Sequence, residues 1–222
     1  MNFSSDSQHC IRCGTCCEKG GPAFHREDRF LIDTGRIHTR FLYTIRAGEM
    51  VRDDVRGVAG PAPSEIIKIK GRAGTWACVF YDPEKKACAV YDQRPLECRL
   101  LKCWDTGDLE RAYERDRLTR QDLIGGIAGL WDLVADHEQR CAYRLLQTHI
   151  DALGGPRRKD AIAAVIAMVR YDREIRRLVM EKGGIEAGMT DFIFGRPLAE
   201  TLQPFGYKIA LRNGREGLIS VD

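Results

Sequence analysis

The residues best suited to chemistry in this 222-residue chain are its cysteines, because eight of the nine lie between Cys10 and Cys103. Four form the run C-x2-C-x2-C-C, at Cys10, Cys13, Cys16 and Cys17. Thiolates repel one another and pack no better than aliphatic side chains, so their concentration favours a soft cation that compensates their charge. Gly14, directly after Cys13, permits the unusual backbone conformation that metal-binding turns often need.

The second set of cysteines is more widely spaced and comprises Cys78, Cys88, Cys98 and Cys103. Together the two sets supply eight ligands. That number fills two four-cysteine zinc sites, one iron–sulfur cluster plus one zinc, or two clusters. Cys16 and Cys17 are adjacent and therefore awkward on a single ion, so they could serve different centres.

The spacing favours iron over zinc for at least one centre. Zinc sites usually draw paired C-x2-C knuckles from two places, whereas nine, nine and four residues lie between the later cysteines. A dense local run is typical of iron–sulfur clusters, although this run departs from the C-x2-C-x2-C-x3-C of bacterial ferredoxins. We therefore expect an iron–sulfur cluster, preferably 4Fe–4S, with zinc as the alternative or as a second centre.

The pattern of charged and apolar residues predicts a reducing compartment for these thiols. The sequence opens without a basic region followed by an apolar run, and no apolar stretch is long enough to cross a bilayer. We expect a cytoplasmic protein without a membrane partner, in which clustered cysteines bind metal ions rather than form disulfides. The formal net charge of +3 counts thiols as neutral. Thiolates would remove that excess, so nucleic acid is not an expected partner.

A few further side chains are candidates for the centre or its surroundings. His9 and His25 could replace a cysteine or orient one. Arg94 and Arg99 could compensate a thiolate-rich centre, as possible cofactor-binding residues, or could pair with nearby carboxylates. Cys141 lies in an expected helix, where a free cysteine is commonly a small buried apolar residue, so it is left out of the site.

The elements that must position the cysteines are short strands and turns. Residues 66–70 alternate apolar and basic side chains, as in a half-buried strand. Residues 76–81 and 87–91 favour strands and are separated by a turn containing Pro83. If Tyr81 pairs with Ala87, then Cys78 and Cys88 share one face of this hairpin.

The second half of the chain reads as helices. One helical stretch is expected from 120 towards 153, with a break or a close helix crossing at Gly125, Gly126 and Gly129. Another spans 159–182, with an arginine strip that we interpret as a solvated face. The tail predicts two strands around Asn213-Gly214. The fold class is therefore α+β, with a cysteine-rich region at 1–107, followed by a helical half with a possible C-terminal hairpin at 108–222.

The cysteine pattern resembles the YkgJ-type cysteine-cluster family, whose domains are described as zinc- or iron-chelating. The likeness rests on the opening run, on Cys78 and Cys88, and on the segment Y-D-Q-R-P-L-E-C-R at 91–99, which matches Y-x-x-R-P-x-x-C-R. It covers about the first half of the chain and implies metal binding by all eight cysteines. A similar cluster occurs in flagellin lysine methylases, where an iron–sulfur centre is implicated.

Three functions remain open on this evidence. The first is a metal-binding protein that stabilises itself through its centre or carries, stores or senses metal or electrons. The second is an iron–sulfur-dependent enzyme that performs redox or radical chemistry, for example protein modification. The third is a zinc-stapled interaction module whose helical half docks a protein partner. No phosphate loop, dinucleotide fingerprint or G-x-S-x-G motif occurs, so the sequence leaves enzyme status undecided.

Overall fold

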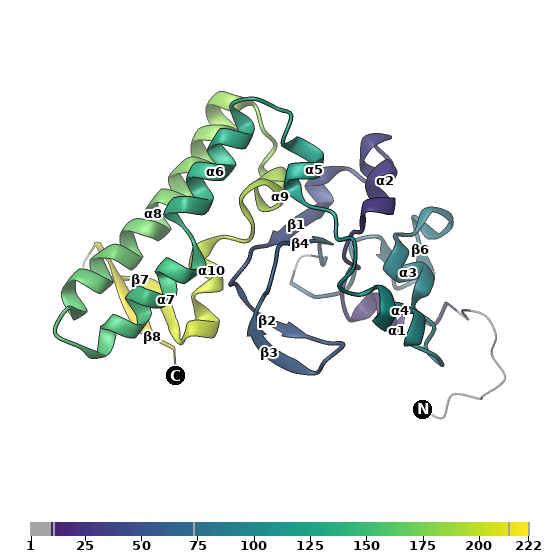
Figure 1. The fold of residues 1–222 in the computed structure, drawn as a ribbon, viewed down its shortest axis with the longest axis horizontal. Coiled ribbons are helices and arrows are strands. Elements are labelled where there is room, and N and C mark those ends of the chain that lie inside the picture. Colours follow the sequence, from purple (N-terminus) through teal and green to yellow (C-terminus); the bar gives the residue numbers. More distant parts are fainter. Residues whose placement is uncertain (1–9, 11, 73, 213, 222) are drawn as a thin grey trace. The chain divides into compact units, whose positions relative to one another are not determined.

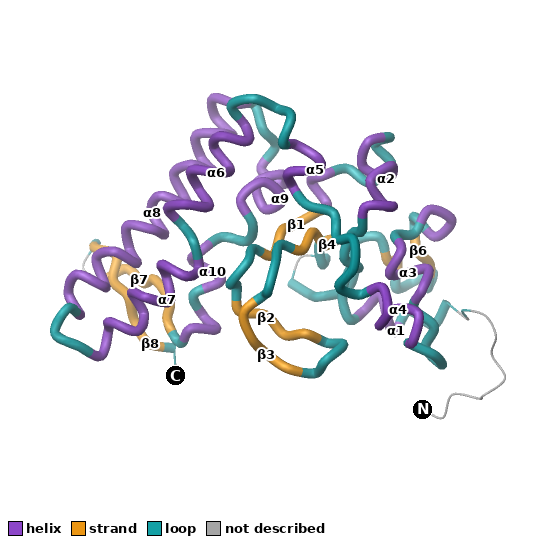
Figure 2. Tube along the Cα trace, in the orientation of Figure 1, coloured by secondary structure: helices purple, strands orange, loops and turns teal. Residues whose placement is uncertain are grey.

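The computed structural model describes residues 10, 12–72, 74–212 and 214–221. It has the α+β architecture predicted from the sequence, with helices and short antiparallel strand pairs (Figures 1 and 2). The described residues form two compact units. The first contains the residues up to Tyr43 together with Ile66–Thr119, and the second contains Thr44–Glu65 together with the residues from Arg120 onward.

The first unit consists of short elements, as the scattered cysteines and turn residues predict. Its helices are α1 (Thr15–Glu18), α2 (Arg29–Asp33), α3 (Leu96–Leu100) and α4 (Gly107–Ala112). Its strands are β4 (Ile66–Ile69), β5 (Tyr81–Asp82) and β6 (Ala87–Cys88), and β1 (Leu42–Ile45) begins in it. Phe24, Leu31 and Ile67 are fully buried, so a small apolar core lies beneath the loops that carry the thiols.

The hairpin of β5 and β6 forms, but its register differs by one residue from the expected one. Tyr81 pairs with Cys88 and Asp82 with Ala87, so the expected pairing of Tyr81 with Ala87 is wrong. The reason lies in the turn: the Asp82 carboxylate accepts hydrogen bonds from the Glu84 and Lys85 amides at 3.0 and 3.1 Å. This Asx-type turn makes Asp82 a strand residue rather than a loop residue.

The second unit is mainly helical. Its helices are α5 (Arg120–Ile124), α6 (Leu130–Arg140), α7 (Tyr143–Asp151), α8 (Arg158–Gly183), α9 (Thr190–Phe194) and α10 (Leu198–Thr201). Two hairpins accompany them, β2 (Met50–Asp53) with β3 (Val58–Pro61), and β7 (Tyr207–Arg212) with β8 (Arg215–Ser220). The expected helix 159–182 and the C-terminal hairpin are both present. The Asn213 half of the predicted turn lies outside the described residues.

Glycines interrupt the expected helical stretch 120–153 at the predicted place. α5 ends at Ile124, and α6 begins after Gly129, whose φ of +77° is unfavourable for other residues. A Cβ at Gly125 would overlap the Gln121 carbonyl. The stretch is divided a second time between Arg140 and Tyr143, so it forms three helices rather than one.

Segment 44–65 belongs to the second unit because polar bonds hold it there. Thr44 donates its hydroxyl to the Phe192 carbonyl at 2.7 Å. The Arg120 guanidinium bonds Glu65 at 2.8 Å and Glu138 at 2.7 Å. These contacts join residues far apart in the chain, so no local sequence pattern predicts them. The expected division of the chain after residue 107 stays a prediction, because spatial proximity does not report independent folding.

The core of the second unit encloses a network of charged side chains. The fully buried His137 bonds Asp172 on α8 at 2.8 Å, and Asp172 also accepts from Arg176 and from the Leu198 amide, both at 3.0 Å. Burial lowers the pKa of His137, and the bonds to His137 and Arg176 outweigh burial to lower the pKa of Asp172 to about 2. Asp172 is therefore ionised, and it links α6, α8 and α10.

The arginine strip expected to be a solvated face is only partly so. Arg170 and Arg173 bond Glu216 on β8 at 2.6 and 2.7 Å, and Arg177 pairs with Glu174 and Glu181. Arg176, in contrast, is 8% exposed and donates to the Gly195 carbonyl at 2.8 Å. The interpretation of Arg176 as a surface residue is therefore wrong. No helix in the described ranges combines the length and apolarity needed to cross a membrane.

We predict that Asp172→Asn lowers the free energy of unfolding by about 3–5 kcal/mol, because it removes the buried carboxylate that compensates the Arg176 guanidinium and bonds the His137 ring. Asp160→Asn is the matched control, since this aspartate lies on the same helix with an exposed side chain. It should change stability by about 0.5 kcal/mol or less. Denaturant unfolding of both variants measures the difference, and equal effects would contradict a central role for the buried network.

Candidate metal centre

The eight candidate cysteines all belong to the first unit, although they come from separate segments of the chain. Cys16 and Cys17 lie on α1, Cys88 ends β6, and Cys98 lies on α3. All nine cysteines of the chain are free thiols. The first unit therefore collects soft donors in the reduced form that metal ligation requires.

A tight turn shapes the opening run. Arg12 and Gly14 have φ values of +56° and +85°, and the Glu18 amide bonds the Gly14 carbonyl at 2.9 Å. Gly14 is buried, and a Cβ there would overlap the Tyr81 phenol. Glycine is thus required both by the backbone conformation and by the close approach of Tyr81. This packing fixes the turn against the β5–β6 hairpin, which ends at Cys88, whereas Cys78 precedes the hairpin and lies outside its strands.

A backbone bond joins the opening run to the hairpin. The Cys78 amide donates to the Cys17 carbonyl at 2.7 Å, and the Tyr81 amide donates to the Cys78 carbonyl at 2.9 Å. Cys88 lies opposite Tyr81 in the ladder. Cys17, Cys78 and Cys88 are therefore held close together by main-chain hydrogen bonds.

Two carboxylates hold α3, which carries Cys98. Asp28, fully buried, accepts hydrogen bonds from the Leu96 amide at 2.8 Å and from the His25 amide at 3.0 Å. Glu97 accepts from the Ala23 amide at 2.7 Å and contacts the His25 ring at 3.3 Å. Acceptors at the first turn of a helix satisfy amides that the helix leaves unpaired. Asp28 and Glu97 thus position Cys98 without being ligands themselves.

The electrostatics of the thiols show that the cysteines gather. Burial raises the pKa of Cys98, and the thiols of Cys78, Cys16 and Cys88 raise it further. Cys17 donates to the Cys16 sulfur, which lowers the pKa of Cys16. Burial also raises the pKa of Cys78 and of Cys103. Cys78, Cys98 and Cys103 therefore resist ionisation on their own, and a bound cation would have to displace their protons.

The eight thiols lie in one unit, but their side chains do not point to a shared metal position. Within the part of the chain that the structure describes, no three side chains of His, Cys, Asp or Glu are arranged to hold a single ion. Thiols are the ligands that soft metals prefer, and these eight lie within one unit. Their side chains, however, are not arranged as a coordination shell. Ligation therefore requires the cysteine side chains to rotate.

Arg94 and Arg99 have different surroundings. Arg94 stacks on Tyr91 with its guanidinium carbon 3.7 Å from the ring centroid, and its charge contributes to the lowered pKa of Cys16. Its buried Nε has no hydrogen-bond partner. Arg99 instead pairs with Glu27 and lies 3.8 Å from Asp28. Of the two, Arg94 has the contacts expected of a residue that compensates thiolate charge, and both roles stay predictions.

The two candidate histidines and the ninth cysteine differ in their surroundings. His25 is buried with both ring nitrogens engaged, one by Glu97 and the other by the Arg115 carbonyl at 2.7 Å, so it supports α3. His9 lies outside the described residues. Cys141 is fully buried in the apolar core of the second unit, with its thiol 3.7 Å from the Met168 carbonyl.

Sequence reasoning missed several side chains that build the site. Asp28 and Glu97 carry no local sign of their role, because their partners lie up to 74 residues away. Arg12 also escaped notice, and its guanidinium carbon lies 4.0 Å from the Tyr91 ring centroid. Tyr91 therefore contacts two guanidinium groups. Its position in the Y-x-x-R-P-x-x-C-R segment was the available signal.

Comparison with known proteins identifies a family whose matched region contains all eight clustered cysteines. A family model described as "CxxCxxCC: Putative zinc- or iron-chelating domain" matches residues 9–120, about half of the chain. The uncharacterized protein MJ0661 of Methanocaldococcus jannaschii is 33% identical over 92 residues, which is 41% of this chain and 42% of that protein. The chain thus spans less than half the length of this relative. No solved structure is significantly similar to the chain.

The turn at Gly14 gives a prediction with an internal control. Gly14→Ala should destabilise the protein through both its positive φ and the overlap with Tyr81, whereas Gly35→Ala adds a methyl group in open space at a φ of +70°. We expect the first to cost at least about 1 kcal/mol more than the second, because left-handed backbone strain is common to both. Denaturant unfolding of each variant tests this, and equal losses would remove the packing role of Gly14.

The His25–Glu97 contact predicts a pH dependence. Burial alone would lower the pKa of His25, but the hydrogen bond to Glu97 and the Arg115 carbonyl raise it above 6.5. The contact should therefore stabilise the protein fully below the unfolded pKa of about 6.5 and lose its effect as the pH rises through the raised folded pKa.

His25→Gln tests this pH dependence. The difference in unfolding free energy between the wild type and this variant should shrink from acidic to alkaline pH. Titration of the thiols is common to both proteins and largely cancels in the difference. A difference that grows with pH would show that the histidine is held neutral.

Proposed function

The chain belongs to the CxxCxxCC family of zinc- or iron-chelating domains, and on this premise we propose that its eight clustered cysteines are the metal ligands. The ligand set comprises Cys10, Cys13, Cys16, Cys17, Cys78, Cys88, Cys98 and Cys103. The observation that carries the proposal is that these free thiols come from separate segments and lie within one unit. If these thiols ionised together they would repel one another, so a bound cation is needed to compensate their charge.

We further propose that at least one centre is an iron–sulfur cluster, with zinc as the alternative or as a second centre. The dense run Cys10–Cys17 supports the cluster, as does the wide spacing of the later cysteines. Such a cluster supplies electron transfer or substrate activation when bound. The chain's own residues would provide thiolates, positive charge from Arg94, and partial shielding from water through the half-buried positions of most of the thiols.

The second candidate is an enzyme that uses the same metal centre. A cavity of about 330 Å³ adjoins the β5–β6 hairpin, close in sequence to Cys78 and Cys88. Its walls include Arg72, Phe80, Tyr81, Asp82 and Glu84. A pocket with apolar walls and a few charged groups is typical of a site for a small molecule. A spectral change of the metal centre when a ligand enters this cavity would favour the enzyme over a metal carrier.

Protein purified without oxygen tests the proposed function. We expect it to be brown and to contain iron and acid-labile sulfide. Cys98→Ser should lose at least one complete centre because it removes a thiolate ligand, whereas Cys141→Ser should keep the full metal content. Circular dichroism of each variant controls for unfolding.

The outcomes distinguish the metals. Colourless protein with stoichiometric zinc would overturn the iron assignment and retain the eight-cysteine site. Loss of metal in Cys141→Ser would refute the ligand set, since this thiol lies in the apolar core of the other unit. Protein that binds neither metal under these conditions would refute metal binding altogether.

A further inference from the structure

One aromatic ring of the first unit contacts two arginines. The guanidinium carbon of Arg12 lies 4.0 Å from the centroid of the Tyr91 ring, and that of Arg94 lies 3.7 Å from it. The face of an aromatic ring carries negative partial charge, so a cation within about 6 Å of it is attracted. Tyr91 thus holds cations from two parts of the chain that are about 80 positions apart.

The residues of this contact belong to segments that carry proposed ligands. Arg12 lies within the opening run of cysteines. Tyr91 follows Cys88, the last residue of β6, by three positions. Arg94 lies two positions before the start of α3, the helix that carries Cys98. The Tyr91 ring therefore joins the opening run to the segments of Cys88 and Cys98.

The backbone at Arg12 needs such a contact. Arg12 has a φ of +56°, a conformation that is unfavourable for a residue with a side chain. Its amide donates to the Cys10 sulfur at 3.4 Å, and a donated hydrogen bond favours the thiolate form that binds metal. Unfavourable backbone conformations persist where surrounding contacts hold them, and the Tyr91 ring supplies one for the Arg12 side chain.

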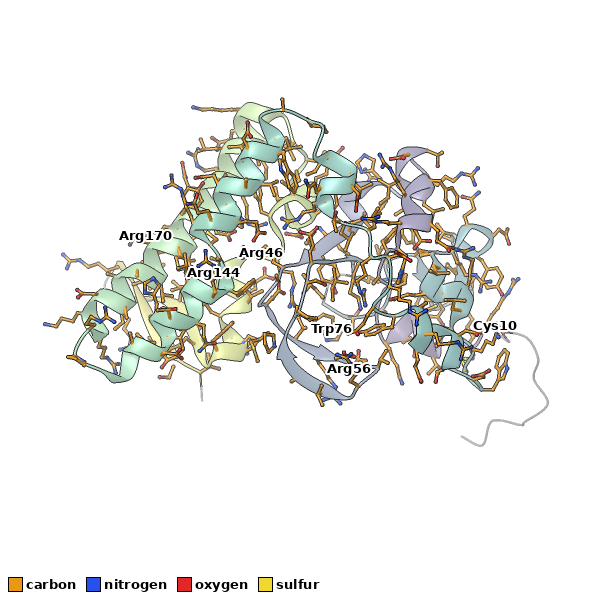
Figure 3. The ribbon with its side chains drawn as sticks, viewed as in Figure 1. Cys10, Arg46, Arg56, Trp76, Arg144 and Arg170 are labelled. Atoms are coloured by element: carbon orange, nitrogen blue, oxygen red, sulfur yellow. The ribbon has the colours of Figure 1, made fainter. Side chains whose placement is uncertain are left out.

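Other contacts brace the opposite end of the opening run. Gly14 packs closely on the Tyr81 phenol, and the Cys17 carbonyl accepts a backbone amide at 2.7 Å. These contacts hold residues 14–17. Cys10, in contrast, is exposed at the beginning of the described chain (Figure 3). The contact with Tyr91 therefore acts on the first half of the run, which the Tyr81 packing does not reach.

Arg94 contacts the same ring from the side of α3. Its side chain is half-buried, and its buried Nε has no hydrogen-bond partner. A planar guanidinium stacks on the face of an aromatic ring, whereas the compact ammonium group of a lysine does not. The contact with Arg94 therefore helps to fix the Tyr91 ring itself.

We infer that Tyr91 is a positioning residue for the metal centre. Its ring anchors the first half of the opening run, Cys10–Cys13, against the segments that carry Cys88 and Cys98, and the ring itself binds no metal. This inference rests on the proposed metal binding and adds a residue that is not a ligand but on which the arrangement of the ligands depends.

A double-mutant cycle on the reduced, metal-free full chain tests the anchor. Arg12→Gln and Tyr91→Leu remove the same contact, so their combined destabilisation should be smaller than the sum of the single effects. The coupling should change the equilibrium constant of unfolding by about 2- to 5-fold, as for a cation–π pair at an exposed site. Tyr113→Leu is the matched control, because Tyr113 is also half-buried and lies over the Arg117 guanidinium at 4.8 Å. Its effect should add to that of Arg12→Gln.

Metal affinity distinguishes positioning of the ligands from simple stabilisation of the fold. Cobalt(II) is titrated into each reduced protein in competition with a chelator, and thiolate-to-metal absorption reports binding. Tyr91→Leu should bind cobalt about 10- to 100-fold more weakly, the usual loss when a residue that orients metal ligands is removed. Tyr91→Phe keeps the ring and should bind like the wild type, as should Tyr113→Leu.

Three outcomes would overturn the inference. Additive effects of Arg12→Gln and Tyr91→Leu would show that the ring does not anchor the opening run. Unchanged cobalt affinity in Tyr91→Leu would show that the ring only stabilises the fold. An equal loss of affinity in Tyr91→Phe would assign the effect to the phenol hydroxyl.

Failure of the proposed function gives a different result. If the wild type binds no cobalt, the proposed metal binding fails and the positioning role fails with it, whereas the metal-free cycle still decides whether Tyr91 anchors the run. Should Tyr91→Leu not fold, Arg12→Gln replaces it in the cobalt titration, because the Arg12 side chain is exposed and its loss should leave the fold intact. Unchanged affinity in that variant would contradict the inference.

Discussion

Two carboxylates, the buried Asp28 and the half-buried Glu97, brace the segment that carries Cys98. Asp28 binds the amide that opens α3, and Glu97 reaches back to the Ala23 amide and the His25 ring. These bonds help to fix α3 and its Cys98 against residues 23–28, which lie about 70 positions earlier in the chain. The thiols can gather only because hydrogen bonds to carboxylates and backbone amides brace the loops that bear them.

The same principle operates in the second unit with different residues. Asp172 joins three helices through His137, Arg176 and the Leu198 amide. The fully buried Arg46 (Figure 3) donates to the Cys141 carbonyl at 3.1 Å, and its guanidinium lies over the Tyr143 ring. Buried charge of this kind specifies one arrangement, since a misplaced partner leaves an ion without compensation. Each unit is therefore held by its own polar network around an apolar core.

Burial and metal binding favour opposite protonation states of the thiols in the first unit. Burial raises the pKa of Cys78 and of Cys98, which keeps these two thiols protonated and less prone to oxidation. Metal binding requires them to ionise and to rotate towards a shared ion. Because the backbone positions are already fixed, the cost of binding falls on proton release and side-chain rotation rather than on folding the loops. Such a unit can select a soft cation without being assembled by it.

The sequence by itself determined the fold class, the breaks at Gly125 and Gly129, the long helix and the C-terminal hairpin, because these depend on local periodicity and turn chemistry. It also predicted that eight of the nine cysteines form one set, and these eight lie in one unit. Tertiary structure alone decided the placement of segment 44–65, the registry of Tyr81 with Cys88, and the roles of Asp28, Glu97 and His25. Those features depend on hydrogen bonds between residues far apart in the chain. In the sequence, a carboxylate that pairs with a distant amide cannot be distinguished from an acidic residue on the surface.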